Sequence, residues 1–218
     1  MKQLAQDVWR LDERIAPLIN VYLAGDVLID AGRRQDRRRI FAQLEGRELS
    51  AVALTHAHPD HQGVAAALCD ERGIPLACHA DDVAAMEGSE PMSGESAISR
   101  MVVRRWGGPP HKVDRVLHEG DEVAGFRVVH APGHSPGEVI FFREADGVAL
   151  CGDVIRNLSY LTMRKSLHEP PDAFNVDSAQ NRESIRKLAA LQPKLIVPGH
   201  GAAVTDIGAF ARFVEGLR

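Results

Sequence analysis

The sequence predicts an α/β fold, because short apolar runs typical of buried strands alternate with segments that have helical periodicity. The strand-like runs lie at residues 8–11, 19–23, 27–29, 49–54, 74–78, 126–130, 148–151 and 195–197. Helices are predicted at residues 33–44, 62–72, 97–106 and 181–191. A Gly25-Asp26 pair predicts a hairpin turn between two of the early strands.

Three histidines and a carboxylate are clustered in the stretch Thr55-His56-Ala57-His58-Pro59-Asp60-His61. Imidazole is a common metal ligand. Residues two apart in an extended segment point the same way, so His56 and His58 can face one ion. Pro59 ends the extension, and Asp60 and His61 are expected to start the following helix and to face another direction. Four ligands on such a bent segment are hard to gather on one tetrahedral ion, so the pattern favours two metals.

Three later segments repeat a common local pattern of a strand, a glycine turn and then one ligand-type residue. The strand at 126–130 runs into Ala131-Pro132-Gly133-His134-Ser135-Pro136-Gly137. The strand at 148–151 runs into Gly152-Asp153, and the strand at 195–197 runs into Pro198-Gly199-His200-Gly201. Glycine permits the sharp backbone turn that leaves a side chain pointing inward from a strand end.

In this order, the motifs T-H-A-H-P-D-H, A-P-G-H-S-P-G, C-G-D and V-P-G-H-G resemble those of the metallo-β-lactamase-fold (glyoxalase II-like) metallo-hydrolase superfamily. Leu28-Ile29-Asp30-Ala31-Gly32 matches the early apolar-Asp-x-Gly element of that superfamily. The resemblance covers nearly the whole chain. It implies a four-layer αββα sandwich, in which two mixed β-sheets face each other, helices flank them, and the site lies at one edge of the sheets.

The resemblance also implies a dinuclear metal site. The predicted ligands are His56, His58 and His134 for the first ion, Asp60, His61 and His200 for the second, and Asp153 as the bridge. All are N or O ligands that suit Zn²⁺, with Fe²⁺ and Mn²⁺ as alternatives. The set contains no cysteine, whereas some β-lactamases place one where Asp153 stands. Antibiotic hydrolysis is therefore not the expected activity.

Other residues have two interpretations each. Asp30 either holds a ligand imidazole in its tautomer or caps a strand end as a turn residue. His130 and His79 are expected to pack at strand ends without binding metal, and Cys151 to be a small buried residue. The arginine run is expected on the solvated face of a helix, with an anion patch as the alternative; it comprises Arg33, Arg34, Arg37, Arg38 and Arg39.

Two irregular segments, 86–118 and 157–176, lie between the ligand motifs, where a substrate wall or lid is expected. Surface loops without function are the alternative. Arg156 and Tyr160 follow Asp153 closely and are candidates to contact a carbonyl or a carboxylate of the substrate. Histidines 111, 118 and 168 carry no motif and are expected at the surface or in a lid.

Length and composition bound the function. The chain has the size of a single domain of this fold, spanning residues 1–218. Only residues 202–218 follow His200, whereas glyoxalase II enzymes carry a helical domain there, so glutathione specificity is not carried over. A net charge of −4 argues against a nucleic-acid partner, and no apolar stretch reaches the length of a membrane span. Three cysteines without framework spacing and the lack of a signal-peptide pattern indicate the cytoplasm.

The predicted reaction is hydrolysis of an activated acyl bond, a thioester, lactone or other ester, in a small molecule. Two divalent ions lower the pKa of water from about 15.7 towards neutrality, so a hydroxide held between them is a nucleophile. Asp60 is expected to orient it and to carry a proton to the leaving group. The alternatives are an iron-dependent redox enzyme, similar to persulfide dioxygenases, and a phosphodiesterase or nuclease of the same fold.

Overall fold

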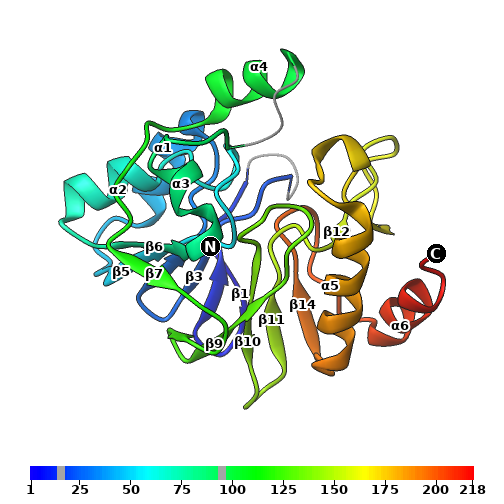
Figure 1. Cartoon of the computed structure of the whole chain (residues 1–218). Helices are drawn as coiled ribbons and strands as arrows, with labels where there is room; N and C mark the ends of the chain where they lie inside the picture. Colours follow the sequence, from blue (N-terminus) through cyan, green and yellow to red (C-terminus); the bar gives the residue numbers. More distant parts are fainter. Residues whose placement is uncertain (14–17, 93–96) are drawn as a thin grey trace.

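Two β-sheets face each other in the computed structural model, which describes residues 1–13, 18–92 and 97–218 (Figure 1). Over these residues the first sheet has seven strands in chain order: β1 (Lys2–Ala5), β2 (Val8–Arg10), β3 (Tyr22–Ala24), β4 (Val27–Ile29), β5 (Ala51–Ala53), β6 (Leu76–His79) and β7 (Arg115–Leu117). Strands β1 to β4 pair antiparallel, and β4 to β7 pair parallel.

The second sheet is also mixed. Its order across the described part of the chain is β14 (Leu195–Val197), β11 (Val148–Leu150), β10 (Val139–Arg143), β9 (Phe126–His130) and β8 (Glu122–Val123). Strands β11 and β14 are parallel, and the other neighbours are antiparallel. A small antiparallel pair, β12 (Arg156–Asn157) and β13 (Leu167–His168), stands apart.

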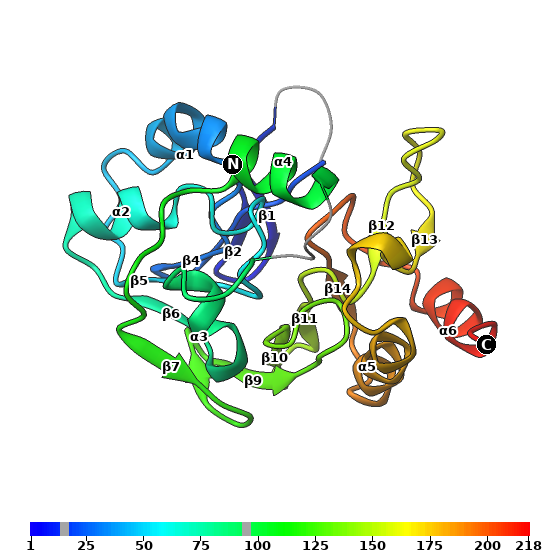
Figure 2. The same cartoon turned by 45° about the horizontal axis from the view of Figure 1, so that its top comes forward.

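Helices cover the outer faces of both sheets (Figures 1 and 2). Outside the first sheet lie α1 (Arg37–Gln43), α2 (Ala65–Arg72) and α3 (Val83–Met86), and outside the second lie α5 (Ser178–Ala190) and α6 (Ile207–Glu215). Helix α4 (Ala97–Trp106) lies at one end of the sandwich. Short 3-10 turns are η1 (Arg34–Asp36), η2 (Ala80–Asp82) and η3 (Asp172–Phe174).

Three apolar cores separate the four layers. Ile29 and Phe141 belong to the core between the sheets. Leu28, next to Ile29 on β4, belongs instead to the core under α1 and α2. Ile140, next to Phe141 on β10, belongs to the core under α5 and α6. Neighbouring residues enter different cores because successive side chains of a strand point to opposite faces. The arrangement confirms the predicted αββα sandwich.

The loop that follows β5 differs from its prediction. Asp60 and His61 lie in turns, and helix α2 begins only at Ala65. The reason is that two N–H groups before the helix are bonded to another loop: that of Gly63 donates to the carbonyl of Gly32 at 2.7 Å, and that of Val64 donates to the carbonyl of Ala31 at 3.2 Å. A Cβ on Gly63 would lie 2.4 Å from the neighbouring backbone, so this close approach requires glycine.

The strand predicted from Ile19 begins at Tyr22 instead, because Asn20 is bonded to the loop at 198–201. Its backbone N–H and its Nδ2 donate three hydrogen bonds of 2.8 Å to carbonyls of that loop. These hydrogen bonds stabilise the position of the loop that carries His200.

The two segments expected to be irregular contain some regular structure. Strand β7 ends the first, and β13 and η3 lie in the second. Strands β1 and β10 and helix α6 were not assigned from the sequence. Within the described ranges, every helix is too short or too polar to span a lipid bilayer.

Candidate metal centre

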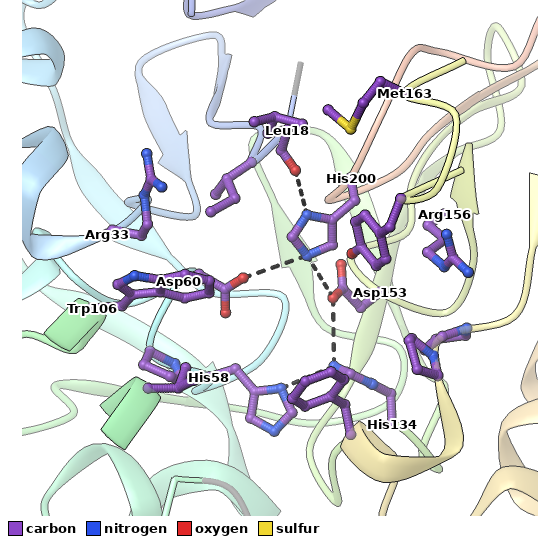
Figure 3. Close-up of a pocket in the computed structure, with 17 residues that line it drawn as sticks. Leu18, Arg33, His58, Asp60, Trp106, His134, Asp153, Arg156, Met163 and His200 are labelled. Carbon is purple, nitrogen blue, oxygen red and sulfur yellow. Dashed lines mark hydrogen bonds and ion pairs between the residues drawn. The ribbon is translucent and has the colours of Figure 1, made fainter. Parts of the chain in front are cut away.

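Four loops bring the predicted ligands together at one edge of the sandwich, and Figure 3 shows five of them: His58, Asp60, His134, Asp153 and His200. Each loop follows the carboxyl end of a strand: β5, β9, β11 or β14. In chain order they supply His56, His58, Asp60 and His61, then His134, then Asp153, then His200. Six of these side chains belong to buried residues, and Asp60 is partly exposed. A glycine directly precedes His134, Asp153 and His200 and permits the sharp turn that directs each of these side chains inward.

The ligand atoms form overlapping groups in which all atoms lie within 4.8 Å of one another: His56, His58 and His134; His56, His61 and Asp153; and Asp60, His61 and His200. Nδ1 of His58 lies 2.9 Å from Nε2 of His134. The carboxylate of Asp153 lies 3.5 Å from Nε2 of His134. It also lies 3.5 Å from Nε2 of His61 and 3.0 Å from Nε2 of His200. Asp153 therefore contacts members of both predicted ligand sets, as a bridging residue must.

The outward nitrogens of the imidazoles have partners of their own. Nδ1 of His134 is hydrogen-bonded to Oδ1 of Asn175 at 2.9 Å, and Nδ1 of His200 is hydrogen-bonded to the carbonyl of Leu18. Contacts of this kind fix the tautomer and the ring orientation. They leave Nε2 of both rings directed at the cluster.

Asp30 orients His61 in the same way. Its Oδ2 lies 2.8 Å from Nδ1 of His61, and its Oδ1 accepts a hydrogen bond from the backbone N–H of Thr55 at 2.8 Å. The backbone of Asp30 has a φ of 61°, a turn conformation that aspartate tolerates. Both interpretations of Asp30 therefore hold: it is a turn residue, and it holds an imidazole of the cluster.

Glu138 is part of the site and was missed by sequence reasoning. It is fully buried, and its Oε2 lies 3.2 Å from Nδ1 of His56. Its Oε1 accepts a hydrogen bond from the backbone N–H of Asp153 at 3.0 Å. Glu138 thus links a ligand of the first set to the loop of the bridging residue. The available signal was a carboxylate placed directly before the apolar run V-I-F-F.

The pKa values divide the histidines into two kinds. Burial and neighbouring imidazoles hold the pKa of His56 and His58 well below the usual range, so both rings are neutral. Burial also acts to lower the pKa of His61 and His200, but carboxylates outweigh it. Asp153 and Asp30 raise the pKa of His61 well above the usual range, and Asp153 and Asp60 raise that of His200 to about 9. Burial acts to raise the pKa of Asp153, but the neighbouring His200 and His61 outweigh the effect of burial, so the pKa of Asp153 lies well below its usual range. A cation that binds His61 and His200 must therefore displace protons.

The donor atoms fit divalent cations. Nε2 of His56, Nε2 of His61 and Oδ1 of Asp153 are buried and have no hydrogen-bond partner among the described residues. An unpaired buried polar atom costs about 1–3 kcal/mol, so a set of them facing one another calls for a ligand. Imidazole nitrogens and carboxylate oxygens are donors for Zn²⁺, Fe²⁺ and Mn²⁺.

The remaining histidines and the arginine run lie outside the cluster. His79 and His130 stack on each other with ring centroids 4.0 Å apart, and Nε2 of His130 is hydrogen-bonded to the carbonyl of Pro136 at 2.9 Å. Together with Asp81 they form a separate group of ligand-type side chains. Cys151 is a free, buried cysteine. The exposed arginines of the run are Arg34, Arg37 and Arg38.

A cavity of about 440 Å³ opens onto the cluster (Figure 3). Val102 and Trp106 of α4 form part of one wall, and Tyr160, Met163 and Phe174 form part of another. Both irregular segments therefore contribute to the wall of this cavity, and their contact with a substrate stays a prediction. Arg33, expected on a solvated helix face, also lines the cavity.

Comparisons with known proteins agree with the fold and indicate a family. A family model described as the Metallo-beta-lactamase superfamily matches residues 17–200. The "Probable metallo-hydrolase YflN" of Bacillus subtilis (strain 168) is 29% identical over 93% of this chain and 87% of its own length. The crystal structure of TTHA1623 in a di-iron-bound form is 33% identical, covers 91% of this chain and 95% of that one, and has a TM-score of 0.70. The crystal structure of the BLEG-1 B3 metallo-beta-lactamase is 26% identical, covers 96% of this chain and 100% of that one, and has a TM-score of 0.73.

Proposed function

The chain belongs to the metallo-β-lactamase superfamily, and from this premise we propose that it is a dinuclear metal-dependent hydrolase that cleaves an activated acyl bond of a small molecule. The bond class is a thioester, a lactone or another ester. The proposed cofactors are two divalent cations, with Zn²⁺ first and Fe²⁺ or Mn²⁺ as alternatives. The observation that carries the proposal is the position of Asp153, which lies within 3.5 Å of imidazoles from both ligand sets.

Two divalent cations held by these seven side chains would lower the pKa of water towards neutrality and polarise a substrate carbonyl. The protein's own contribution is geometric. Three imidazoles of the cluster are held at their outward Nδ1 atoms by contacts with Glu138, Asp30 and Asn175. Little reorganisation of these rings is therefore needed when a ligand binds. The apolar side chains of the cavity walls exclude water from the reacting groups.

Asp60 is the proposed proton carrier. It lines the cavity, is partly exposed, and its Oδ2 lies 3.5 Å from Nε2 of His200. A carboxylate at this position can orient the attacking water, take its proton and pass that proton to the leaving group. Such a role needs no serine or cysteine nucleophile, and the three cysteines of the chain are buried and outside the ligand groups.

Iron-dependent redox chemistry is the second candidate, and the di-iron-bound form of TTHA1623 is the observation that favours it. A complete set of ligands for two metals favours hydrolysis, because a redox enzyme with one iron uses only part of it. A phosphodiesterase or nuclease activity is less well supported, since the net charge of −4 disfavours a nucleic-acid partner.

The test is to load the metal-free protein separately with Zn²⁺, Fe²⁺ and Mn²⁺ and to measure metal content alongside activity. We expect metal-dependent hydrolysis of at least one compound in a panel of thioesters, lactones and aryl esters. Bis-nitrophenyl phosphate cleavage and persulfide-dependent oxygen uptake are measured in parallel. A fully loaded protein that hydrolyses no compound of the acyl panel would contradict the proposal, and oxygen uptake or phosphodiester cleavage would identify which alternative replaces it.

A further inference from the structure

Two arginines line the cavity at the metal centre, and they differ in how their charges are compensated (Figure 3). Nε of Arg33 lies 3.0 Å from Oδ2 of Asp36, and its Nη2 lies 3.3 Å from Oδ1 of the same carboxylate. This two-pronged pair neutralises Arg33. Figure 3 shows Arg33 and Arg156 on opposite sides of the ligand side chains.

Arg156 has no carboxylate partner in the described parts of the chain. Its Nε donates to the backbone carbonyl of Glu169 at 3.1 Å, and its Nη1 donates to the carbonyl of Leu158. The side chain of Glu169 is engaged elsewhere, at 2.9 Å from Nε of Arg182. Backbone carbonyls thus hold the guanidinium of Arg156 in place, and the carboxylate whose charge acts on it is Asp153, the proposed bridge between the metals, which forms no ion pair with it.

The position of Arg156 is fixed and close to the metal centre. Its guanidinium lies over the ring of Tyr160, 4.4 Å from the centroid, and that ring lies 6.3 Å from the ring of His200. Burial lowers the pKa of Arg156. Partly burying a charge is costly unless an opposite charge accompanies it, so a cation held ready in a substrate cavity is suited to an anionic ligand.

The other walls of the cavity are apolar. The apolar side chains that line it include those of Leu18, Val102, Trp106, Met163 and Phe174. A suitable ligand therefore combines an apolar group with an anionic one.

We propose that Arg156 binds a carboxylate of the substrate and that the protein hydrolyses acidic acyl compounds. These are esters or thioesters that have a carboxylate a few bonds from the scissile carbonyl and an apolar group on the other side of that carbonyl. The assignment of a reaction rests on the proposed function, but the anion site does not. Binding and hydrolysis are therefore measured separately.

Binding is tested on the metal-loaded protein by calorimetry with adipate and hexanoate, which differ by one terminal carboxylate. The wild-type protein should bind adipate about 10–100-fold more tightly, the range expected for a charge-assisted hydrogen-bonded pair. Arg156→Gln should remove that advantage and leave hexanoate binding unchanged, and Arg156→Lys should keep part of it. Circular dichroism and thermal melting confirm that the variants fold.

Hydrolysis is tested with two matched pairs of thioesters. Within each pair, one compound has a free carboxylate and the other has its methyl ester. The carboxylate is on the thiol part in the first pair and on the acyl part in the second. In at least one pair, the wild-type kcat/KM should favour the free acid by about 10-fold or more, and Arg156→Gln should abolish the preference by lowering only the value for the acid. Arg33→Gln serves as the comparison, because Arg33 is the cation already paired with Asp36.

The outcomes separate the two ideas. Equal binding of adipate and hexanoate by the wild type, or an advantage that survives in Arg156→Gln, overturns the anion site. Loss of the preference to the same extent in Arg33→Gln also overturns it, because general positive charge would then explain the effect. If no thioester is cleaved but the adipate advantage depends on Arg156, the proposed reaction fails and the anion site stands.

Discussion

Replacing Asp153 by Asn is expected to lower kcat/KM by about 10³-fold or more and to reduce the bound metal from two ions to one per chain. The substitution keeps the size of the side chain but removes the charge that lies beside His134, His61 and His200. An amide has only one oxygen to offer, so it cannot serve two cations as a carboxylate can. Activity and elemental analysis of the same sample provide the measurement.

Asp146→Asn is the matched control. Asp146 lies on the turn between β10 and β11 and pairs with Arg143 at 2.7 Å, with a partly exposed side chain. Losing such a surface pair costs at most about 1 kcal/mol and should leave kcat/KM and metal content unchanged. Wild-type activity in Asp153→Asn with two ions still bound would show that Asp153 does not bridge them.

Removing the metals is expected to lower the melting temperature by about 8–16 °C for each ion that was present at about a thousand times its dissociation constant. The estimate combines about 4.1 kcal/mol of binding linkage with a shift of about 2–4 °C per kcal/mol for a chain of this size. The physical reason is that the metals would bind buried nitrogens and oxygens that have no hydrogen-bond partner among the described residues, such as Nε2 of His56 and Oδ1 of Asp153. Scanning calorimetry before and after chelation measures the shift.

The shift should shrink as the pH is lowered from 9 to 6. His200 has a pKa of about 9 in the metal-free protein, and that of His61 is raised as well, so protons compete with the second cation more strongly at lower pH. His111→Ala, which removes a histidine outside the ligand groups, should retain the full shift, and His134→Ala should lose much of it. Identical melting with and without metal would contradict the account.

The ligand cluster could be predicted because its residues follow a local rule. His134, Asp153 and His200 each follow a short apolar strand and a glycine turn, and the resemblance to a known superfamily implied that they meet the His56 loop at one edge of the sheets. The two-sided burial of the sheets was also visible, since runs such as V-A-L-C at 148–151 are apolar throughout.

Other features depend on contacts between distant residues and were not visible locally. The helix after His61 begins late because Gly63 is bonded to the carbonyl of Gly32, a tertiary contact that overrides helix propensity. Glu138, directly before β10, contacts His56 of the loop after β5, which is far away in the sequence. The contact of Glu138 with His56 depends on how the chain folds around this buried carboxylate, and no spacing in the sequence indicates it.

Some omissions had a local signal. Strand β10 has the β-branched and aromatic run V-I-F-F, and α6 begins after Asp206, whose side chain accepts a hydrogen bond from the N–H of Ala209 at 2.8 Å. Both patterns were present in the sequence and could have been assigned. The pair β12 and β13 is different, because strands of two residues are too short for periodicity to identify.

The most direct test is to locate the ions by anomalous diffraction from crystals of the metal-loaded protein. The account predicts two ions about 3.5–4 Å apart. One should lie among His56, His58 and His134, and the other among Asp60, His61 and His200, with an oxygen of Asp153 at each. A single ion in fully loaded crystals, or a second ion that does not contact Asp153, would contradict the dinuclear centre.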